Sequence, residues 1–475
     1  MAHGRPKPVD GERAFSLDEL FFSTTDERGV IRSGNAVFAR VSGYPLAELC
    51  GRPHSLVRHP DMPRVVFKLL WDYLKAGKTI AAYVKNMAAD GRHYWVIATA
   101  ASIDGGYISV RFKPSSPIFP KIAAVYGELL EIEMRIEEKG RPIAEAMAAS
   151  GKRLGEILAS LGFESYDAFM NAFLPLEIKS RNDRLSTRGA PADAFRHADP
   201  ELSLAGRRID ALAAALRGLF DGLGAFADLN QELCAKAEFL LGLATEISLV
   251  STNALVSAKR IGDAGLALSV VADILGKSTE TGAALVRVIN EGIARIVDIL
   301  RSLATDVAVS SLQIEAAEFF AREVAAGAES GVSAKAEDLA NMSDLTECVE
   351  IGMRRLSKRL VELELALPRT SGDIEAFTEI LRTLEMIHVT GKIEAERLAH
   401  AGAFRGLFDA VVERVTVAKS EMARCAAVIF DTRARLRAFD QRATLETAVA
   451  LRQGAGRMAA ELFAPAVECP ESDSR

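Results

Sequence analysis

The sequence predicts an α+β protein in which a small β-sheet domain precedes an all-α region of long helices. Three observations carry this prediction. Strand-like runs are confined to residues 20–113, the stretch "KPSSP" at residues 113–117 then interrupts the pattern, and after about residue 205 apolar residues recur in alternating steps of three and four. The first pattern is typical of strands and the last of a coiled coil or four-helix bundle.

The N-terminal prediction rests on five runs rich in β-branched and aromatic residues, separated by turn signals such as "DERG", "ADGR" and "DGG". The runs are "LFFSTTD", "GVIRSGN", "TIAAYVKNM", "RHYWVIATAASI" and "GYISVRF". Both tryptophans and all but one of the seven tyrosines lie before residue 130, as expected for a small packed sheet. We therefore predict a sheet domain over residues 20–117 that follows a flexible N-terminus, residues 1–19.

After Pro117 the composition becomes helical, and the predicted helices of residues 118–185 are broken at Gly140–Pro142 and at Gly162. Residues 118–202 are interpreted as a helical connector that ends in a linker. The long-helix bundle is predicted over residues 203–445 and a C-terminal tail over 446–475.

The bundle prediction depends on heptad ladders, which are series of mostly apolar residues in alternating steps of three and four. Such a series keeps a 3.5-residue period over many turns. The first ladder runs from Ile209 to Ile261 and is polar only at Asn230 and Ser251. Later ladders run from Ile374 to Leu398 and from Phe408 to Phe439. A helix that followed a 3.6-residue period would drift out of this register.

The ladders repeat at an offset of 137 residues (388 − 251), which pairs the polar positions Ser251 and His388. Each ladder then reaches a glycine, Gly265 or Gly402. We interpret this as a duplicated antiparallel hairpin, about 205–325 and 335–440, that packs as an intramolecular four-helix bundle. Chance superposition of two heptad helices is the alternative.

Composition limits the function classes. The chain has 475 residues, 49% hydrophobic residues and a net charge of −6, and this mild acidity disfavours nucleic acid as the main partner. Five scattered cysteines without a CxxC motif suggest neither a disulfide framework nor a zinc site. We find no signal-peptide pattern and no uninterrupted apolar run of membrane-spanning length, so a cytoplasmic location without a membrane span is expected.

Residues 247–277, "ISLVSTNALVSAKRIGDAGLALSVVADILGK", resemble the hairpin tip of bacterial chemoreceptors, the methyl-accepting chemotaxis proteins. The second hairpin keeps fewer of the matching positions. The tip positions carried over are Asn253, Arg260, Gly262 and Gly265 in the first hairpin and Glu394, Arg397 and Gly402 in the second.

That resemblance implies a bundle whose tip binds the chemotaxis histidine kinase and its coupling protein. In the family two chains each give one hairpin, whereas this chain supplies both, which predicts a pseudo-dimer. Ser257, Asp263 and Leu266 replace charged residues at the family's tip, so weakened docking is expected. No methylation site stands out.

Residues 20–113 resemble the PAS sensor domain of aerotaxis receptors, and its pattern is followed by residues 34–78 and 84–98, which include "GRPHSLVRHPDMPRVVFKLLWDYL" and "VKNMAADGRHYWVIA". The resemblance implies a five-stranded antiparallel sheet, with helices over one face, that holds FAD non-covalently. Ile80 stands where flavin-binding members usually carry tryptophan; heme and an empty cavity are the alternatives. The positions that correspond to cofactor-supporting residues are Asn35, Arg58, His59, Asp61, Trp71 and Asn86.

Three of these residues also have a purely structural interpretation. Asp61 could cap a helix that starts at Pro63, and His59 could be a residue at that helix start that is hydrogen-bonded to backbone. Trp71 could pack the domain. Arg58 suits a bidentate contact to a phosphate or to Asp61. The Asn86 amide lies mid-strand in an apolar run and needs partners, which a strand face turned toward a ligand would supply.

The sequence therefore predicts a sensory protein that links redox or oxygen sensing in a PAS domain to a chemoreceptor-like bundle. A PAS scaffold or adaptor without cofactor, which pairs with itself or with partners, is the alternative. We expect no enzyme, because the sequence contains no Ser/His/Asp set, no paired carboxylate site, no P-loop and no metal-ligand cluster.

Overall fold

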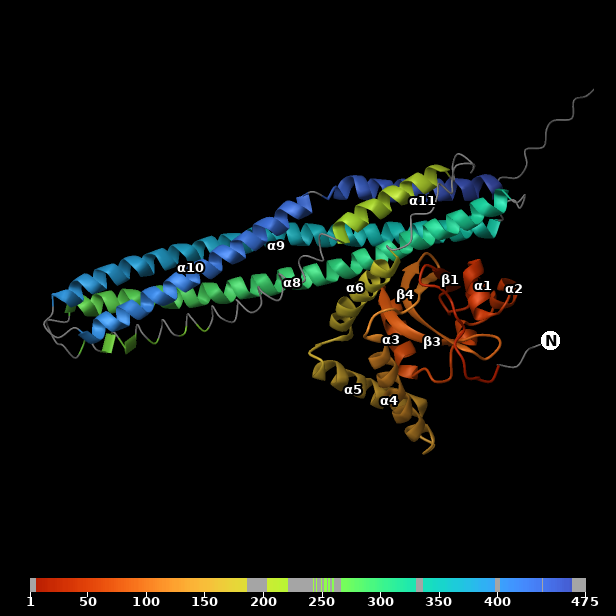
Figure 1. Ribbon diagram of the computed structural model, residues 1–475, viewed down its shortest axis with the longest axis horizontal. Coiled ribbons are helices and arrows are strands. Elements are labelled where there is room, and N and C mark those ends of the chain that lie inside the picture. The colour runs from red at the N-terminus through yellow and green to blue at the C-terminus, as the bar shows by residue number, and fades with distance from the viewer. Residues whose placement is uncertain are drawn as a thin grey trace, which may run out of the picture. The chain divides into compact units, whose positions relative to one another are not determined.

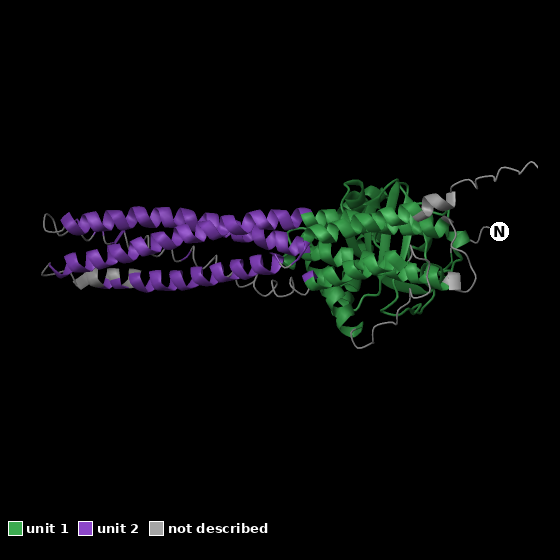
Figure 2. Cartoon of the chain, turned by 90° about the horizontal axis from the view of Figure 1, so that it is seen from above, with its two compact units in different colours: residues 1–218, 304–357, 441–475 green, residues 219–303, 358–440 purple. Residues whose placement is uncertain are grey.

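The computed structural model describes residues 6–185, 203–220, 266–329, 336–397, 402–437 and 439–463, together with single positions between 242 and 259. The chain divides into two compact units, coloured in Figure 2. Unit 1 contains residues 1–218, 304–357 and 441–475, and unit 2 contains residues 219–303 and 358–440. The long helices α8 and α9 each contribute to both units.

Unit 1 contains a five-stranded antiparallel sheet in the order β2-β1-β5-β4-β3, which confirms the five predicted strands. The strands are β1 (Phe21–Asp26), β2 (Ile31–Gly34), β3 (Ile80–Met87), β4 (His93–Ile103) and β5 (Gly106–Phe112). Between β2 and β3 the chain forms α1 (Ala36–Ser42), α2 (Leu46–Leu49), the short 3-10 helix η1 (His54–Val57) and α3 (Arg64–Lys75). The fold class is therefore as predicted for this half (Figure 1).

The segment before the sheet differs from the predicted flexible N-terminus. The Val9 amide donates to the Gly91 carbonyl at 3.0 Å, and the Arg13 amide donates to the His93 carbonyl at 2.7 Å. Phe15 is buried, and its ring meets that of Phe21 edge-on at 5.6 Å. These contacts fix the segment against the β3–β4 turn and the core. A polar composition alone gave no sign of this backbone pairing.

Three helices follow β5, and glycines with positive φ, Gly140 and Gly162, separate them as expected. The helices are α4 (Phe119–Glu137), α5 (Ile143–Ser160) and α6 (Tyr166–Leu185). α4 and α6 cover the outer face of the sheet at β3 and β4. Trp95 meets Phe119 at 5.2 Å between ring centroids, and Tyr83 meets Phe173 at 5.0 Å.

The remainder is helical. Residues 203–220 form one helix, followed by α8 (Leu266–Glu329), α9 (Ala336–Glu396), α10 (Gly402–Arg437) and α11 (Gln441–Phe463). Ladder residues are buried wherever their burial is described, except Phe439, which is half-buried. α11 occupies most of the stretch that was predicted to be a tail. Its apolar residues Ala448 and Leu451 are buried, so it is a packed helix.

Within unit 1, segments of α8 and α9 contact the sheet domain. Phe22 of β1 meets Phe320 of α8 edge-on at 5.2 Å. The Ala36 amide, at the start of α1, donates to Glu323 at 3.0 Å, and the Asp104 amide in the β4–β5 turn donates to Glu347 at 3.1 Å. The sheet domain therefore contacts two different long helices directly.

Within unit 2, α8 packs against α9 and α9 against α10. Gly292 of α8 lies so close to Thr370 of α9 that an added Cβ would be 3.4 Å from the threonine Cβ. Lys419 of α10 is ion-paired with Glu385 of α9 at 3.0 Å. His388 is buried, as expected for a heptad layer residue.

The predicted tip residues are only partly described. Asn253 is exposed in a helix, Glu394 pairs with Arg397 at 2.8 Å, and Gly402 begins α10. Arg260, Gly262 and Gly265 lie outside the described residues, as does Ser251. Among the described helices, none is long and apolar enough to cross a membrane, and the described residues contain no cluster suited to a metal ion.

Candidate functional site

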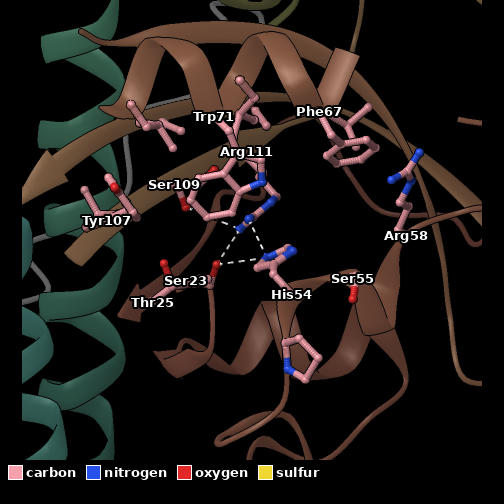
Figure 3. Close-up of a pocket in the computed structure, with 18 of the residues that line it drawn as sticks. Ser23, Thr25, His54, Ser55, Arg58, Phe67, Trp71, Tyr107, Ser109 and Arg111 are labelled. Carbon is pink, nitrogen blue, oxygen red and sulfur yellow. Dashed lines mark hydrogen bonds between the residues drawn. The ribbon is translucent and has the colours of Figure 1, made fainter. Parts of the chain in front are cut away.

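A cavity of about 310 Å³ lies in the sheet domain between α3, η1 and the inner face of the sheet (Figure 3). Its walls come from all these elements and from β1, β3, β4 and β5. The lining includes Ser23, Thr25, His54, Ser55, Arg58, Phe67, Leu70, Trp71, Leu74, Val84, Asn86, Ala98, Ala100, Tyr107, Ser109 and Arg111.

One face of α3 forms the apolar wall. Phe67, Leu70, Trp71 and Leu74 are spaced by three, one and three residues, so they share one side of the helix. The Trp71 ring meets Tyr107 of β5 edge-on at 5.6 Å. At Gly29 an added Cβ would lie 2.9 Å from the Trp71 ring, so the absence of a side chain there makes room for the indole.

The sheet supplies the polar wall through its two-residue alternation. On β5, Tyr107, Ser109 and Arg111 line the cavity, and on β3 Asn86 does so. Asn86 is only 3% exposed, yet its side-chain amide has no hydrogen-bond partner within the described part of the chain. Because buried amides are rarely left unpaired, this group points to a polar partner inside the cavity.

Three polar side chains from three elements meet at one end of the cavity. Arg111 Nη2 donates to His54 Nε2 at 2.7 Å, and Nη1 donates to Ser23 Oγ at 3.0 Å. Burial and the Arg111 charge lower the pKa of His54 to about 3. A neutral imidazole that accepts at Nε2 carries its proton on Nδ1, so His54 acts here as an uncharged acceptor. Figure 3 shows these contacts as dashed lines.

Three of the six predicted cofactor residues meet at this cavity: Arg58, Trp71 and Asn86. The Arg58 guanidinium lies 4.1 Å from the Phe67 ring centroid and donates to the Met62 carbonyl at 2.9 Å. Trp71 packs on Tyr107, as its structural interpretation expects, and it also lines the cavity.

Asn35, His59 and Asp61 are not among the lining residues. Asn35 is buried as the N-cap of α1; its Oδ1 accepts from the Phe38 amide at 3.3 Å, and its Nδ2 donates to the Leu20 carbonyl at 3.1 Å. The Asn35 contacts therefore secure α1 to the residue just before β1.

His59 and Asp61 belong to the loop before α3. The buried His59 accepts from the Asp61 amide through Nδ1 at 3.1 Å, and Asp61 accepts from Lys85 Nζ at 2.7 Å. Partial burial raises the Asp61 pKa, but the hydrogen bond from Lys85 and the nearby His59 outweigh it, so the pKa is lowered. Asp61 does not cap α3.

The cap of α3 comes from another helix. Glu133 of α4 accepts from the amides of Arg64 and Val65 at 2.7 and 3.0 Å, and from Ser150 Oγ at 2.8 Å. These amides are the first donors of α3, which its own N-cap, Pro63, leaves without a side-chain partner. The helix that forms the cavity wall is therefore anchored to α4.

Sequence reasoning missed His54, Phe67 and Arg111. A signal for Arg111 was present, because in "GYISVRF" the residues at 107, 109 and 111 alternate with the apolar residues 108, 110 and 112. An arginine on the more polar face of such a strand indicates a polar cavity or partner. His54 gave no comparable signal, because its place beside Arg111 depends on tertiary packing.

Residues 32–110 match the protein-family model described as PAS fold. The match covers β2 to β5 and the helices that enclose the cavity. The N-terminal domain is a PAS domain. Over 117 residues the chain is 40% identical to the aerotaxis receptor of Escherichia coli (strain K12). This stretch covers 24% of the chain and 23% of that receptor, so the chain matches about a quarter of the receptor's length.

Two solved structures are also similar. One is a light-oxygen-voltage domain studied with a flavin analogue, at 19% identity, covering 26% of this chain and 87% of that one, with a TM-score of 0.20. The other is the light state of the Aureochrome1 LOV domain, at 20% identity, covering 22% and 88%, with a TM-score of 0.20.

The PAS cavity has the chemistry of a site for a flat aromatic ligand with a polar edge. Its volume lies at the lower end of the range for small-molecule sites, and it combines aromatic walls with a few polar groups. The unpaired Asn86 amide and the aromatic rings of Phe67 and Trp71 suit a flavin ring. Heme fits less well, because the histidine in the lining, His54, already accepts from Arg111 through Nε2.

Proposed function

We propose that the PAS domain binds FAD in this cavity and that the protein is a sensor of redox state or oxygen. The observation that carries the proposal is the Asn86 amide, which is buried and unpaired in the described structure and faces an aromatic-walled cavity. The 40% identity to the aerotaxis receptor in this region supports it. We propose no cofactor contact for Asn35, His59 or Asp61, because these residues do not line the cavity.

The signal leaves the domain through α3 in this proposal. A change at the cavity moves Phe67 or Trp71, these residues move α3, and the Glu133 cap transmits that movement to α4. A second route leads from β1 to α8 through Phe22 and Phe320, which are in edge-on contact. Each route joins an element that lines the cavity to a helix outside the sheet. A small change at the cavity can therefore alter the position of that helix.

The helical half is the proposed output. We propose that its hairpins form one intramolecular, chemoreceptor-like bundle that contacts the chemotaxis histidine kinase and its coupling protein, with docking weakened by Ser257, Asp263 and Leu266. The role is sensory rather than enzymatic, the proposed location is the cytoplasm, and PAS self-association is a further proposed contact.

Absorption spectroscopy of the purified full-length protein tests the cofactor. We expect the visible spectrum of oxidised flavin and FAD in the supernatant after denaturation. Asn86→Ala should reduce FAD affinity about threefold to tenfold, the equivalent of one hydrogen bond of about 0.5–1.5 kcal/mol. Asn35→Ala is the matched control: the same change at a buried amide outside the cavity should lower stability without changing the affinity of the folded protein.

The alternatives give different spectra. A folded protein that is colourless and releases no flavin would reject the proposal in favour of a scaffold without cofactor. A Soret band would identify heme instead. An Asn86→Ala variant with unchanged affinity would show that the cavity binds FAD without this amide.

A further inference from the structure

Arg111 is a buried cation without a counter-charge. It is 4% exposed, and its guanidinium contacts Ser23, His54 and the Ser109 carbonyl, all of them neutral groups. Among the described residues, no carboxylate lies within ion-pair distance of it. Burial accordingly lowers the pKa of Arg111 to about 10, which still leaves the side chain charged at neutral pH.

The groups around Arg111 compensate its positive charge only in part. The guanidinium carbon lies 5.5 Å from the Phe38 ring centroid and 6.0 Å from that of Phe21, a favourable but weak cation–π arrangement. Among the described residues, the ionisable groups that interact with the guanidinium are His54 and Tyr94. Both are uncharged at neutral pH, because burial lowers the His54 pKa and raises that of Tyr94. The guanidinium is therefore hydrogen-bonded but not neutralised.

A second buried arginine of the same unit shows the ordinary arrangement. The Arg181 side chain is 3% exposed, and it is ion-paired with Glu315 at 2.7 Å. A buried charge is costly unless it is paired, so Arg181 has a structural explanation that Arg111 lacks. Arg111 differs in one further respect, because it lines the cavity.

We propose that Arg111 is the counter-charge for an anionic group of the cavity ligand, held in place by the neutral acceptors His54 and Ser23. This inference rests on the proposed function. With a flavin in the cavity, Arg111 would offset the single negative charge that remains when an electron from an external reductant enters the ring without a proton. Arg111 is then a positioning and potential-setting residue, and reduction becomes easier because the cavity already contains the cation.

The first test needs no ligand. In full-length protein freed of cofactor, Arg111→Met removes an uncompensated cation and keeps an apolar side chain of similar length. The thermal midpoint of the PAS domain should stay the same or rise. Arg181→Met, the matched control, leaves Glu315 without its partner and should lower the midpoint. An Arg111→Met variant that melts as early as Arg181→Met would overturn the proposal, because Arg111 would then be a structural residue.

The second test measures the reduction potential of the flavin-loaded protein by spectroelectrochemistry. Arg111→Met should make uptake of the first electron at least tenfold less favourable, which is 59 mV for one electron. Arg111→Lys keeps the charge and should lie between Arg111→Met and wild type. Equal potentials in all three proteins would refute the counter-charge. A wild-type protein that takes up no flavin would instead reject the proposed function and, with it, the flavin as Arg111's ligand, even if the melting result holds.

Discussion

At the scale of single residues, the cavity depends on a histidine that stays neutral beside a cation. The folded PAS domain holds His54 with a pKa of about 3, whereas an unfolded chain has a histidine pKa of about 6.5. Between these values the unfolded chain binds a proton that the folded chain does not. The free energy of unfolding therefore falls as pH decreases from about 6.5 toward 3.

This linkage gives a pH prediction. From pH 7 to pH 5 the PAS domain should lose as much as about 2 kcal/mol of stability through His54, and His54→Gln, which keeps an acceptor but cannot titrate, should remove that loss. Urea denaturation followed by tryptophan fluorescence measures it, because both tryptophans lie in the PAS domain. The control is His388→Gln in unit 2. An equal pH slope in wild type and His54→Gln would contradict the prediction.

Sequence reasoning could find some site residues and not others. Asn86 was predictable because an amide in an apolar strand must find a partner. Asn35 and Asp61 belong to stretches that resemble a cofactor domain, but their side chains face local backbone and Lys85. Which side of a loop a polar residue faces is decided by tertiary packing, and the local sequence carries no period that reports it.

At the scale of elements, α3 is both the cavity wall and the helix capped by α4. The helix was predictable from the sequence, which places its start at Pro63, and the five strands were predictable from their β-branched and aromatic runs between turn signals. The cap of α3 was not predictable from the sequence, because Glu133 lies 69 residues from Arg64 in the chain. Only the folded arrangement of α3, α4 and α5 brings the carboxylate to those amides.

Glu133→Ala should remove the cap of α3 and cost about 0.5–2 kcal/mol of PAS stability. The amides of Arg64 and Val65 should then exchange with solvent faster, since they lose their acceptor. Glu131→Ala is the control, because Glu131 is an exposed residue of the same helix in a surface ion pair with Arg135. If both substitutions have the same small effect on stability and exchange, Glu133 does not anchor α3.

At the scale of the whole molecule, the hairpins are proposed to pack within one chain. The alternating steps of three and four made the buried ladder positions predictable. They did not predict that most of the expected tail folds as the packed helix α11, because those residues lie beyond the ladders. The close approach of Gly292 and Thr370 joins a helix of the first predicted hairpin to one of the second.

That contact gives a test of chain topology. The Cβ separation of 3.4 Å is near the range of a disulfide, so Gly292→Cys combined with Thr370→Cys should form a bond within one chain. After mild oxidation of a variant whose native cysteines are replaced by alanine, a non-reducing gel should show a 51.2 kDa monomer. A disulfide-linked dimer as the main product would indicate that the helices pair between chains.

The central claim is that the state of the cavity is communicated to the helices outside the sheet. Hydrogen–deuterium exchange of the full-length, flavin-loaded protein, measured in its oxidised and reduced states, tests this most directly. The account predicts that reduction changes exchange in α3, at the amides of Arg64 and Val65, and in α4 around Glu133. Identical exchange of α3 and α4 in the two states would contradict it.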